Sequence, residues 1–380
     1  MPIVYATVGV EGTSIGSITN QAGEFRLHLA DSLRRKSLVF SHVGYVAQKI
    51  DIPLLTAGQH FTLTLEPRIF PLQEVVIRVV HPIRLMREML EKRMINYSQK
   101  PVYFTTFYRE GVQYKQKFRS LTEAVFKIYK SPVQSLYARE QVKLLKMSRI
   151  TDGLEQDTLI ARMSGGIDAC LQLDIINHLP DFLLADAHKD VYAYTSADVT
   201  IVGDHLVNVI SFEQKKEVKE PLYCGELYID SDNGALLQAQ IRIHPRYMKQ
   251  ATDMVVQRQA RRMKIVLQEL TYTISYKPWN GTYYINHVRG DLHFKVKQKR
   301  QWLGSSSLHT WFEMVTCKID TVGVTRFQRN ERIPTRTVFA DTHFKYDSDF
   351  WENFNVIPWE KQLVEVIEQL TSKIEKIEYE

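Results

Sequence analysis

The chain has 380 residues, a length that corresponds to about two or three domains. Its hydrophobic content of 44% and charged content of 24% are those of a folded globular protein, and they exclude general disorder. The formal net charge of +6 is too small at this length to indicate a nucleic-acid-binding protein.

The first 80 residues predict a β-sandwich. Short runs of alternating apolar and polar residues recur at close intervals, and turn residues separate them. In one such run Phe25, Leu27 and Leu29 fall on the same face of the expected strand. At least six strands and no helical period are expected here, at residues 5–10, 17–19, 24–29, 37–41, 61–65 and 75–80.

The turns of this region carry a family resemblance. Thr19-Asn20-Gln21-Ala22-Gly23-Glu24-Phe25 and Ser41-His42-Val43-Gly44-Tyr45 form the pattern T-N-x-x-G-x-F … S-x-x-G-Y. The region resembles the carboxypeptidase-regulatory-like domain, a transthyretin-like sandwich at the front of many Bacteroidetes envelope proteins. The resemblance implies an accessory domain without peptidase chemistry. None of the 12 histidines is followed by Glu three residues later, so the His-x-x-Glu zinc pair is absent.

The beginning of the chain departs from that family. The first residues, Met1-Pro2-Ile3-Val4-Tyr5, already read as part of a strand, whereas the family usually has one more strand ahead of this point. We therefore expect a truncated start, with a first strand and an export signal lost or an internal methionine taken as the first residue. The resemblance implies a periplasmic or outer-membrane-associated protein.

A linking helix is expected over residues 81–98. Pro82 suits a first helical position, and apolar residues recur at helical spacing up to Tyr97. Residues 99–380 then predict a larger antiparallel β domain, a meander that curls into a half-barrel. Its expected strands are 104–110, 120–129, 198–213, 223–229, 235–243, 268–276, 282–297 and 310–320, with helices within 167–184 and 245–264.

This larger part carries two further resemblances. Phe107-Tyr108-Arg109-Glu110, residues 284–290 and residues 350–357 resemble the body of Bacteroidetes carboxypeptidase-like regulatory domain envelope proteins of unknown function. The pattern G-x-L-Y-I-D … A-L-L-Q-A at residues 225–239 is similar to LolA-like lipoprotein-carrier half-barrels. Neither resemblance implies a catalytic residue.

A final amphipathic helix is expected over residues 358–379. From Asp347 to Glu380 the chain has 3 Lys, no Arg and 9 acidic residues, so the rest of the chain carries the compensating positive charge. We expect the apolar face of this helix to dock on the β domain, near the basic clusters at 258–264 and 295–300. Docking on a partner protein is the alternative.

Several patterns that suggest chemistry are weak in this sequence. Residues 12–16 fit G-x-S-x-G, but strand and turn signals follow where a nucleophile elbow needs a helix. Residues 230–234 begin like a calcium loop but lack Gly at its position 6 and Glu at its position 12, and so predict a turn. A solvated helix face and loop explains the acidic and histidine residues between positions 168 and 190: Asp168, Asp174, His178, Asp181, Asp186, His188 and Asp190.

The remaining signals point to no site. The cysteines Cys170, Cys224 and Cys317 are far apart and form no CxxC, which argues against a disulfide framework or a cysteine zinc site. The basic clusters favour an anionic membrane surface or the acidic final helix over nucleic acid. No apolar run reaches the roughly 18 residues of a membrane-spanning helix. We therefore predict no catalytic residue, no metal and no cofactor.

The sequence thus favours a non-enzymatic cell-envelope binding or assembly protein. A lipid or other amphiphile, a glycan or a protein segment would bind in the concave face of the β domain, lined by Tyr, Phe and Trp. The alternatives are a structural accessory of a TonB-dependent outer-membrane transport system and a hydrolase with an unrecognised site. Spatially assembled sites leave no sequence motif, so the hydrolase stays open at this point.

Overall fold

The structure, a computed structural model, describes most of the chain. It describes residues 1–55, 58, 60–68, 81–133, 140–151, 161–163, 166–184, 190–202, 205–259, 263–298, 304–335, 351, 354–359 and 363–364. Strands predominate in these ranges, and they form one small sheet, one large antiparallel sheet and a two-stranded ribbon. The mainly β class expected from the sequence is confirmed.

The N-terminal region forms a four-stranded antiparallel sheet. Its strands lie in the order β2 (Gly16–Ile18), β1 (Thr7–Val10), β3 (Ser37–Ser41) and β4 (Gln48–Asp51). Two short 3₁₀ helices, η1 (Asp31–Leu33) and η2 (Ile52–Leu54), flank β3 and β4. The alternation of the strands places Val8, Val10, Leu38 and Phe40 in a common apolar core.

Two expected strands of this region do not pair. Residues 24–29 and 61–65 contribute Phe25, Leu27, Leu29, Leu63 and Leu65 to the core, as their alternation predicted. Neither segment belongs to a strand ladder within the described residues. Alternation reports which side chains are buried, whereas a ladder also needs a neighbouring backbone in register. The expected strand 75–80 lies outside the described residues.

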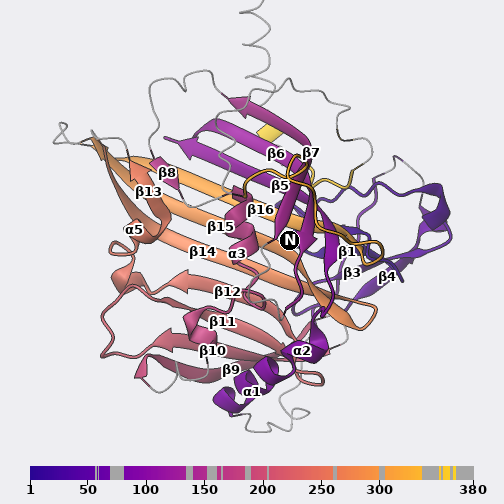
Figure 1. Cartoon of the computed structure of the whole chain (residues 1–380), viewed down its shortest axis with the longest axis horizontal. Coiled ribbons are helices and arrows are strands. Elements are labelled where there is room, and N and C mark those ends of the chain that lie inside the picture. The colour runs from indigo at the N-terminus through magenta and orange to yellow at the C-terminus, as the bar shows by residue number, and fades with distance from the viewer. Residues whose placement is uncertain are drawn as a thin grey trace, which may run out of the picture.

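The rest of the chain is built on a ten-stranded antiparallel sheet (Figure 1). In spatial order its strands are β7 (Gln141–Thr151), β6 (Lys117–Lys130), β5 (Val102–Tyr114), β16 (Ser306–Asp320), β15 (Thr282–Gln298), β14 (Met263–Trp279), β12 (Leu236–Ile243), β11 (Tyr223–Asp230), β10 (His205–Gln214) and β9 (Tyr192–Val202). Most neighbours are consecutive in sequence, so the expected meander is confirmed. There are two exceptions: β14 pairs with β12, because β13 (Val256–Gln259) pairs with β8 (Ala161–Met163), and β5 pairs with β16, the last strand of the sheet.

The structure differs from the sequence analysis at three places in this domain. The single strand expected at 198–213 is the hairpin of β9 and β10; the sequence has Gly203-Asp204 at the join, a pair typical of hairpin turns. Strand β7 was not predicted. The helix expected within 245–264 is present only as one turn, α5 (Thr252–Val255); the rest of this range is η5 (Pro245–Tyr247), β13, which pairs with β8, and the start of β14.

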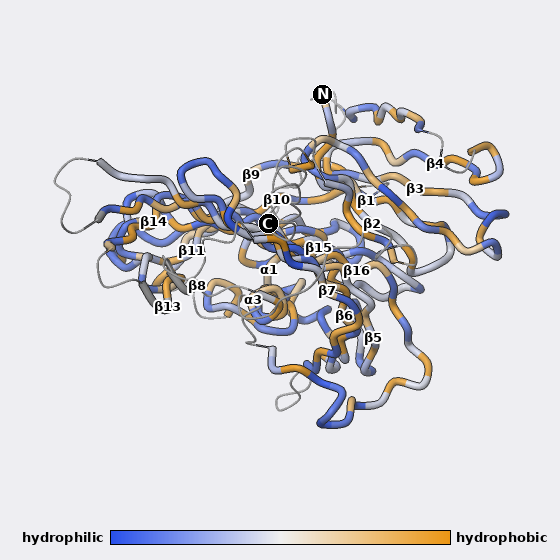
Figure 2. The backbone as a smooth tube through the Cα atoms, turned by 90° about the horizontal axis from the view of Figure 1, so that it is seen from above, coloured by the Kyte–Doolittle hydropathy of each residue, from blue (hydrophilic) through white to orange (hydrophobic). Residues whose placement is uncertain are grey.

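Helices cover one face of the large sheet. The linking helix is confirmed as α1 (Pro82–Glu91) and α2 (Arg93–Asn96), and α3 (Gly166–Gln172) and η4 (Asp181–Leu183) follow later in the chain. Seen from above, the sheet bends around α3, so this helix-covered face is the concave one (Figure 2). None of the helices in the described residues is long and apolar enough to cross a membrane.

The N-terminal sheet packs against the opposite, convex face (Figure 2). The Ser14 hydroxyl donates to the carbonyl oxygen of Ile319 at 2.9 Å and accepts from the Ile319 amide at 3.0 Å. The side chain of Asn286 donates to the Thr7 hydroxyl at 3.1 Å. The small sheet therefore sits over the ends of β15 and β16.

The outer edge strand β9 is protected against further pairing. A bulge interrupts its pairing with β10 next to Asp198, and the Asp198 carboxylate accepts from the Val199 amide at 2.7 Å. The Gly44 amide of the N-terminal region donates to the carbonyl oxygen of Ile201 at 2.7 Å. Bulges and local capping of edge groups are common protections of this kind.

A glycine in β15 is required by close packing. A Cβ atom at Gly290 would lie 2.4 Å from Cζ of Phe312 on β16, which is buried. We therefore expect Gly290→Ala to lower the free energy of unfolding by about 1–3 kcal/mol, measured by chemical denaturation. Gly9→Ala is the control, because a Cβ there meets no atom within 4 Å. Equal stabilities of the two variants would contradict this packing.

Candidate functional site

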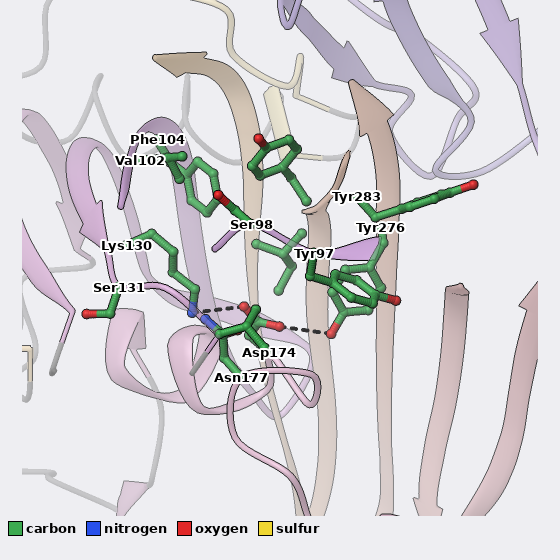
Figure 3. A pocket seen from close by; sticks show the side chains of 13 residues that line it. Tyr97, Ser98, Val102, Phe104, Lys130, Ser131, Asp174, Asn177, Tyr276 and Tyr283 are labelled. Atoms are coloured by element: carbon green, nitrogen blue, oxygen red, sulfur yellow. Dashed lines mark hydrogen bonds and ion pairs between the residues drawn. The ribbon is translucent and has the colours of Figure 1, made fainter. Parts of the chain in front are cut away.

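A buried lysine at the end of β6 lies between two carboxylates on the concave side. Lys130 Nζ is 2.8 Å from Glu140 Oε1, just before β7, and 2.8 Å from Asp174 Oδ2, just after α3. The Tyr276 hydroxyl donates to Asp174 Oδ1 at 3.0 Å (Figure 3). His178 Nε2 is 3.4 Å from Glu140 Oε1. We call Lys130, Glu140, Asp174 and Tyr276 the lysine cluster.

The charges of the lysine cluster fix its protonation. Burial acts to lower the pKa of Lys130, but the two carboxylates outweigh it and raise that pKa. For Glu140, burial acts in the raising direction, and the neighbouring Lys130 and His178 lower its pKa below the usual range. Burial also raises the pKa of Tyr276 well above its ordinary value. Lys130 is thus held as an ammonium ion, which has no lone pair for nucleophilic or base chemistry.

The lysine cluster borders a small cavity (Figure 3). Its volume is about 20 Å³, close to the space that one water molecule needs. Aromatic rings form much of its wall: Tyr97, Phe104, Tyr276, Tyr283 and Tyr284. The apolar side chains of the concave face pack around it in one core with α1, α3 and η4. The cavity as it stands has no room for an acyl chain or a sugar.

A row of alternating charges crosses the convex face. Glu123 on β6, Arg109 on β5, Glu313 on β16 and Arg289 on β15 stand directly opposite one another in the strand register. Arg109 donates from Nε to Glu123 Oε1 at 2.7 Å, and its Nη1 is 3.6 Å from Glu313 Oε1. Arg289 Nη1 is 3.4 Å from Glu313 Oε2. All four side chains are at most 5% exposed. We call them the charge row.

The N-terminal region covers one end of the charge row. The Arg289 guanidinium lies over the rings of Tyr5 and Trp311, at 5.4 and 5.0 Å from their centroids. It also donates to Asp291 at 2.6 Å. Burial acts to raise the pKa of Asp291, but hydrogen bonding from His309 and the charge of Arg289 lower it to about 2. The Tyr5 ring therefore covers the Arg289 end of the charge row, where Asp291 stays ionised beside the guanidinium.

The C-terminal segment, residues 354–359, covers the other end. Arg109 Nη2 donates to the carbonyl oxygen of Ile357. The Trp359 indole Nε1 donates to Glu123 Oε1 at 2.8 Å. The segment therefore satisfies both members of the Arg109–Glu123 pair.

The same segment also contacts the N-terminal region. The Asn20 side chain donates to the carbonyl oxygen of Pro358 at 3.2 Å, and the His28 amide donates to Asn355 Oδ1 at 2.6 Å. The Cys317 thiol of β16 donates to the carbonyl oxygen of Asn355 at 3.2 Å. Residues 354–359 are thus held between the two sheets by side chains of both. We call Asn20, His28, Arg109, Glu123 and Cys317 the segment site.

The expected final helix is described only at its beginning. Pro358 and Trp359 are not helical, residues 363 and 364 are, and the rest of 358–379 lies outside the described residues. Leu363 is buried against Leu121, Ile150 and Trp311 of the large sheet. At this point the chain docks on its own β domain.

A buried lysine lies where the two sheets meet. Lys277 of β14 donates from Nζ to the carbonyl oxygens of Thr316 at 2.7 Å and Ser14 at 3.4 Å. Its ammonium group has no carboxylate partner among the described residues. Burial lowers the pKa of Lys277 to about 8, against a smaller opposing effect of Cys317.

The weak sequence patterns turn out to be structural within the described residues. Residues 230–234 form the turn between β11 and β12, as predicted. The Asp230 carboxylate is buried and accepts from the Asp232 amide at 2.8 Å, and His205 Nδ1 lies 2.8 Å from it. Ligand atoms of His205, Asp230 and Asp232 lie within 4.8 Å of one another, so these are the side chains that could hold a cation. The predicted absence of a metal stays a prediction.

The other acidic, basic and serine candidates lie in different parts of the structure and form no common site among the described residues. Asp174 joins the lysine cluster, and Asp168 accepts from the Thr335 hydroxyl at 2.7 Å. Asp186 and His188 lie outside the described residues. Ser14 of the G-x-S-x-G pattern lies in the β1–β2 hairpin and bonds to β16. Lys295 and Lys297 are exposed on one strand, as expected, whereas Arg261, Arg262, Lys299 and Arg300 are not described.

Comparison with known proteins identifies the first part of the chain. Residues 1–77 match the family model described as the CarboxypepD_reg-like domain. The resemblance based on the turn motifs around Gly23 and Gly44 is therefore confirmed for this region. No curated protein matches the chain.

Three solved structures align with 64–65% of this chain at low similarity. A domain from Vibrio parahaemolyticus named for outer membrane lipoprotein sorting has 10% identity and a TM-score of 0.27, over 64% of this chain and 94% of that one. A DUF1329 family protein from Desulfovibrio piger has 11% identity and a TM-score of 0.28, over 65% and 96%. MucB in complex with MucA(peri) has 10% identity and a TM-score of 0.20, over 64% and 100%. All three TM-scores lie below 0.5, and the architecture given above rests on the strand pairing of this chain.

The charge row and the segment site were not predicted from the sequence. Part of the evidence was in the sequence. Each of the four expected strands concerned has one charged residue of the charge row within its bounds: Arg109, Glu123, Arg289 and Glu313. Charged residues of an antiparallel sheet are expected on the face that is in contact with water, when only the other face packs on a core. Only the docking of the N-terminal region and residues 354–359 buries them.

The lysine cluster leads to a prediction for Lys130→Met. The substitution leaves two buried carboxylates without their cation, and we expect it to cost about 3–5 kcal/mol at pH 7. The loss should shrink towards pH 5, because the buried Glu140 carboxylate, without the lysine that lowers its pKa, then takes up a proton and the folded variant gains stability as the pH falls. Chemical denaturation at both pH values measures this. The control is Lys143→Met, whose pair with Glu331 is about one-third exposed and should matter by less than about 1 kcal/mol.

The buried Lys277 leads to a prediction of opposite sign. Its pKa in the folded chain, about 8, lies below the value of about 10.4 for an unfolded lysine. Between these values the unfolded chain holds the proton and the folded chain does not, so stability rises with pH in that window. Lys277→Met should therefore be more stable than the wild type at pH 7, with a smaller advantage at pH 10. An advantage that does not change with pH would refute the assignment.

Proposed function

We propose that this chain is a non-enzymatic binding and assembly protein of the cell envelope, and that its ligand is a protein segment. The observation that carries the proposal is the way residues 354–359 are held between the two sheets. Side chains of both domains and a buried Arg–Glu pair hold this extended piece of polypeptide. A molecule built in this way has the means to recognise polypeptide backbone.

The concave face supports an amphiphile less well. Its apolar side chains already pack against α1, α3 and η4, and the cavity beside the lysine cluster holds about one water molecule. A lipid, or a glycan, would have to displace part of this core. Apolar surface of the displaced helices would then be exposed to water, at a free-energy cost of roughly 25 cal/mol per Å², and this cost opposes binding.

The buried charges favour binding over catalysis. The Lys130 ammonium is shared by two carboxylates, and Arg109 and Arg289 are neutralised by acidic partners on neighbouring strands. Groups that are paired in this way are poor general acids and bases. A hydrolase with an unrecognised site remains the alternative of a different class.

The envelope location rests on the N-terminal domain. Residues 1–77 match the CarboxypepD_reg-like family, whose resemblance implied an exported protein, periplasmic or associated with the outer membrane. A two-domain body joined by a buried charge row also suits a structural accessory of a TonB-dependent transport system, in which it would connect partner proteins.

A fluorescent apolar probe tests the choice of ligand. We expect N-phenylnaphthylamine to show no saturable binding to the folded wild-type chain at micromolar concentrations, because the described apolar side chains of the concave face pack against helices and the cavity among them holds about one water molecule. Saturable binding at one probe per chain would refute the proposal. If Phe104→Trp, which fills the cavity, abolishes that binding, the chain is an amphiphile carrier with its site in the concave face. Binding that survives Phe104→Trp would place an amphiphile site elsewhere and would refute the proposal as well.

A further inference from the structure

We propose that the segment site is an exchangeable peptide-binding site, in which residues 354–359 are a resident ligand that a partner's segment of the same chemistry replaces. The inference rests on the proposed function and names its site and the kind of partner. The partner supplies an extended segment of the type Asn-aliphatic-aliphatic-Pro-Trp, as in Asn355-Val356-Ile357-Pro358-Trp359.

The floor of the segment site requires an occupant. Arg109 is about 1% exposed and Glu123 about 4%. The guanidinium directs Nη2 to the Ile357 carbonyl oxygen, and the carboxylate accepts from the Trp359 indole. If the segment left and nothing replaced it, both charged groups would lose a partner in a partly dry site, which is costly. An empty site is therefore disfavoured, and a replacement is favoured.

The chemistry of recognition is mostly that of polypeptide backbone. Arg109, Asn20 and Cys317 all donate to main-chain carbonyl oxygens of the segment. Backbone contacts of this kind give affinity without regard to side chains, as in strand-addition complexes. Only the indole N–H on Glu123, the Asn355 side chain on the His28 amide and the buried side chains read the sequence.

The apolar anchors explain why the occupant is aliphatic and aromatic. Val356 and Ile357 are buried in one cluster with Phe107, Val125 and Val315 of the large sheet. The neighbouring Ile18 comes from the N-terminal sheet, so the pocket for the aliphatic side chains is shared by both domains. A polar segment would leave these side chains without contacts.

The pairing pattern explains how the segment can leave. Within the described residues, positions 354–359 belong to no strand and form no ladder with either sheet. The three sheet strands beneath them, β6, β5 and β16, pair with one another directly. Removal of the segment therefore breaks side-chain bonds but no strand ladder. A partner segment competes against a tethered occupant whose effective concentration is on the order of millimolar, so exchange needs a tight or locally concentrated partner.

The test separates the segment from its tether in the full-length protein. A protease site is inserted between residues 344 and 345, and the folded chain is cleaved after purification. A fluorescent peptide of residues 351–364 is then added, and its anisotropy is measured. We expect saturable binding to the cleaved chain, release of the resident fragment, and at least about 100-fold weaker binding to the uncleaved chain, where the tethered segment competes.

A matched peptide tests the recognition itself. Replacing Trp359 by benzothienylalanine keeps the shape of the ring but removes the indole N–H that Glu123 accepts. We expect this peptide to bind about 10-fold more weakly, since a hydrogen bond to a charged group is lost. Glu123→Gln should reduce that difference; if this variant does not fold, the two peptides on the wild-type chain still decide.

Three results would overturn the inference. The cleaved chain unfolds, which makes the segment a permanent part of the core. The resident fragment stays bound for days while the chain remains folded and the labelled peptide does not enter. The two peptides bind equally, so the Trp359–Glu123 contact does not select the ligand. None of these outcomes depends on the apolar-probe measurement, so the segment site can fail while binding of a protein segment at another surface survives.

Discussion

The buried guanidinium of Arg109 is the interaction on which the arrangement of this protein depends. It is bonded to Glu123 on β6, lies against Glu313 on β16 and donates to the Ile357 carbonyl oxygen of the C-terminal segment. A buried charge that loses a partner destabilises the fold by several kcal/mol, about 3–5 in known cases. The pairs of Arg109 with Glu123 and with Glu313 therefore favour one register of β5 with β6 and β16, and the pairing of β5 with the last strand of the sheet is fixed at the same point.

The two faces of the large sheet differ in how they are closed. The concave face is apolar, and helices α1 and α3 close it with a core that leaves a water-sized cavity beside Lys130. The convex face carries the charge row beside a smaller apolar cluster, and the N-terminal sheet and residues 354–359 close it with hydrogen bonds, ring contacts and the packing of Val356 and Ile357. Apolar closure is non-directional, whereas the charged face accepts only donors and acceptors in defined places. The convex face is for this reason the more selective of the two, and the proposed binding of a protein segment belongs there.

The buried charges also explain why site prediction from the sequence reached only part of the answer. The turn at residues 230–234, the hairpin that contains Ser14 and the start of the linking helix at Pro82 follow from local rules about Gly, Asn, Asp and Pro, and the structure has them. Arg109 and Glu123 were not singled out from the sequence, because a strand pattern does not say what packs on its polar face. The lysine cluster could not be predicted from the sequence either. Lys130 is at the end of a strand, Glu140 is in a loop and Asp174 follows a helix, so only the folded chain brings them together.

The sequence alone determined the mainly β class, the CarboxypepD_reg-like match of residues 1–77 and most strands of the large sheet, since these depend on alternation and turn residues close together in the chain. It did not determine that residues 24–29 and 61–65 would stay outside a ladder, or that one expected strand would be the hairpin of β9 and β10. Only the tertiary structure decided that β5 pairs with β16 and that residues 354–359 close the charge row. Contacts across some 200 to 300 residues depend on the total burial and charge balance of the folded chain, which no local pattern encodes.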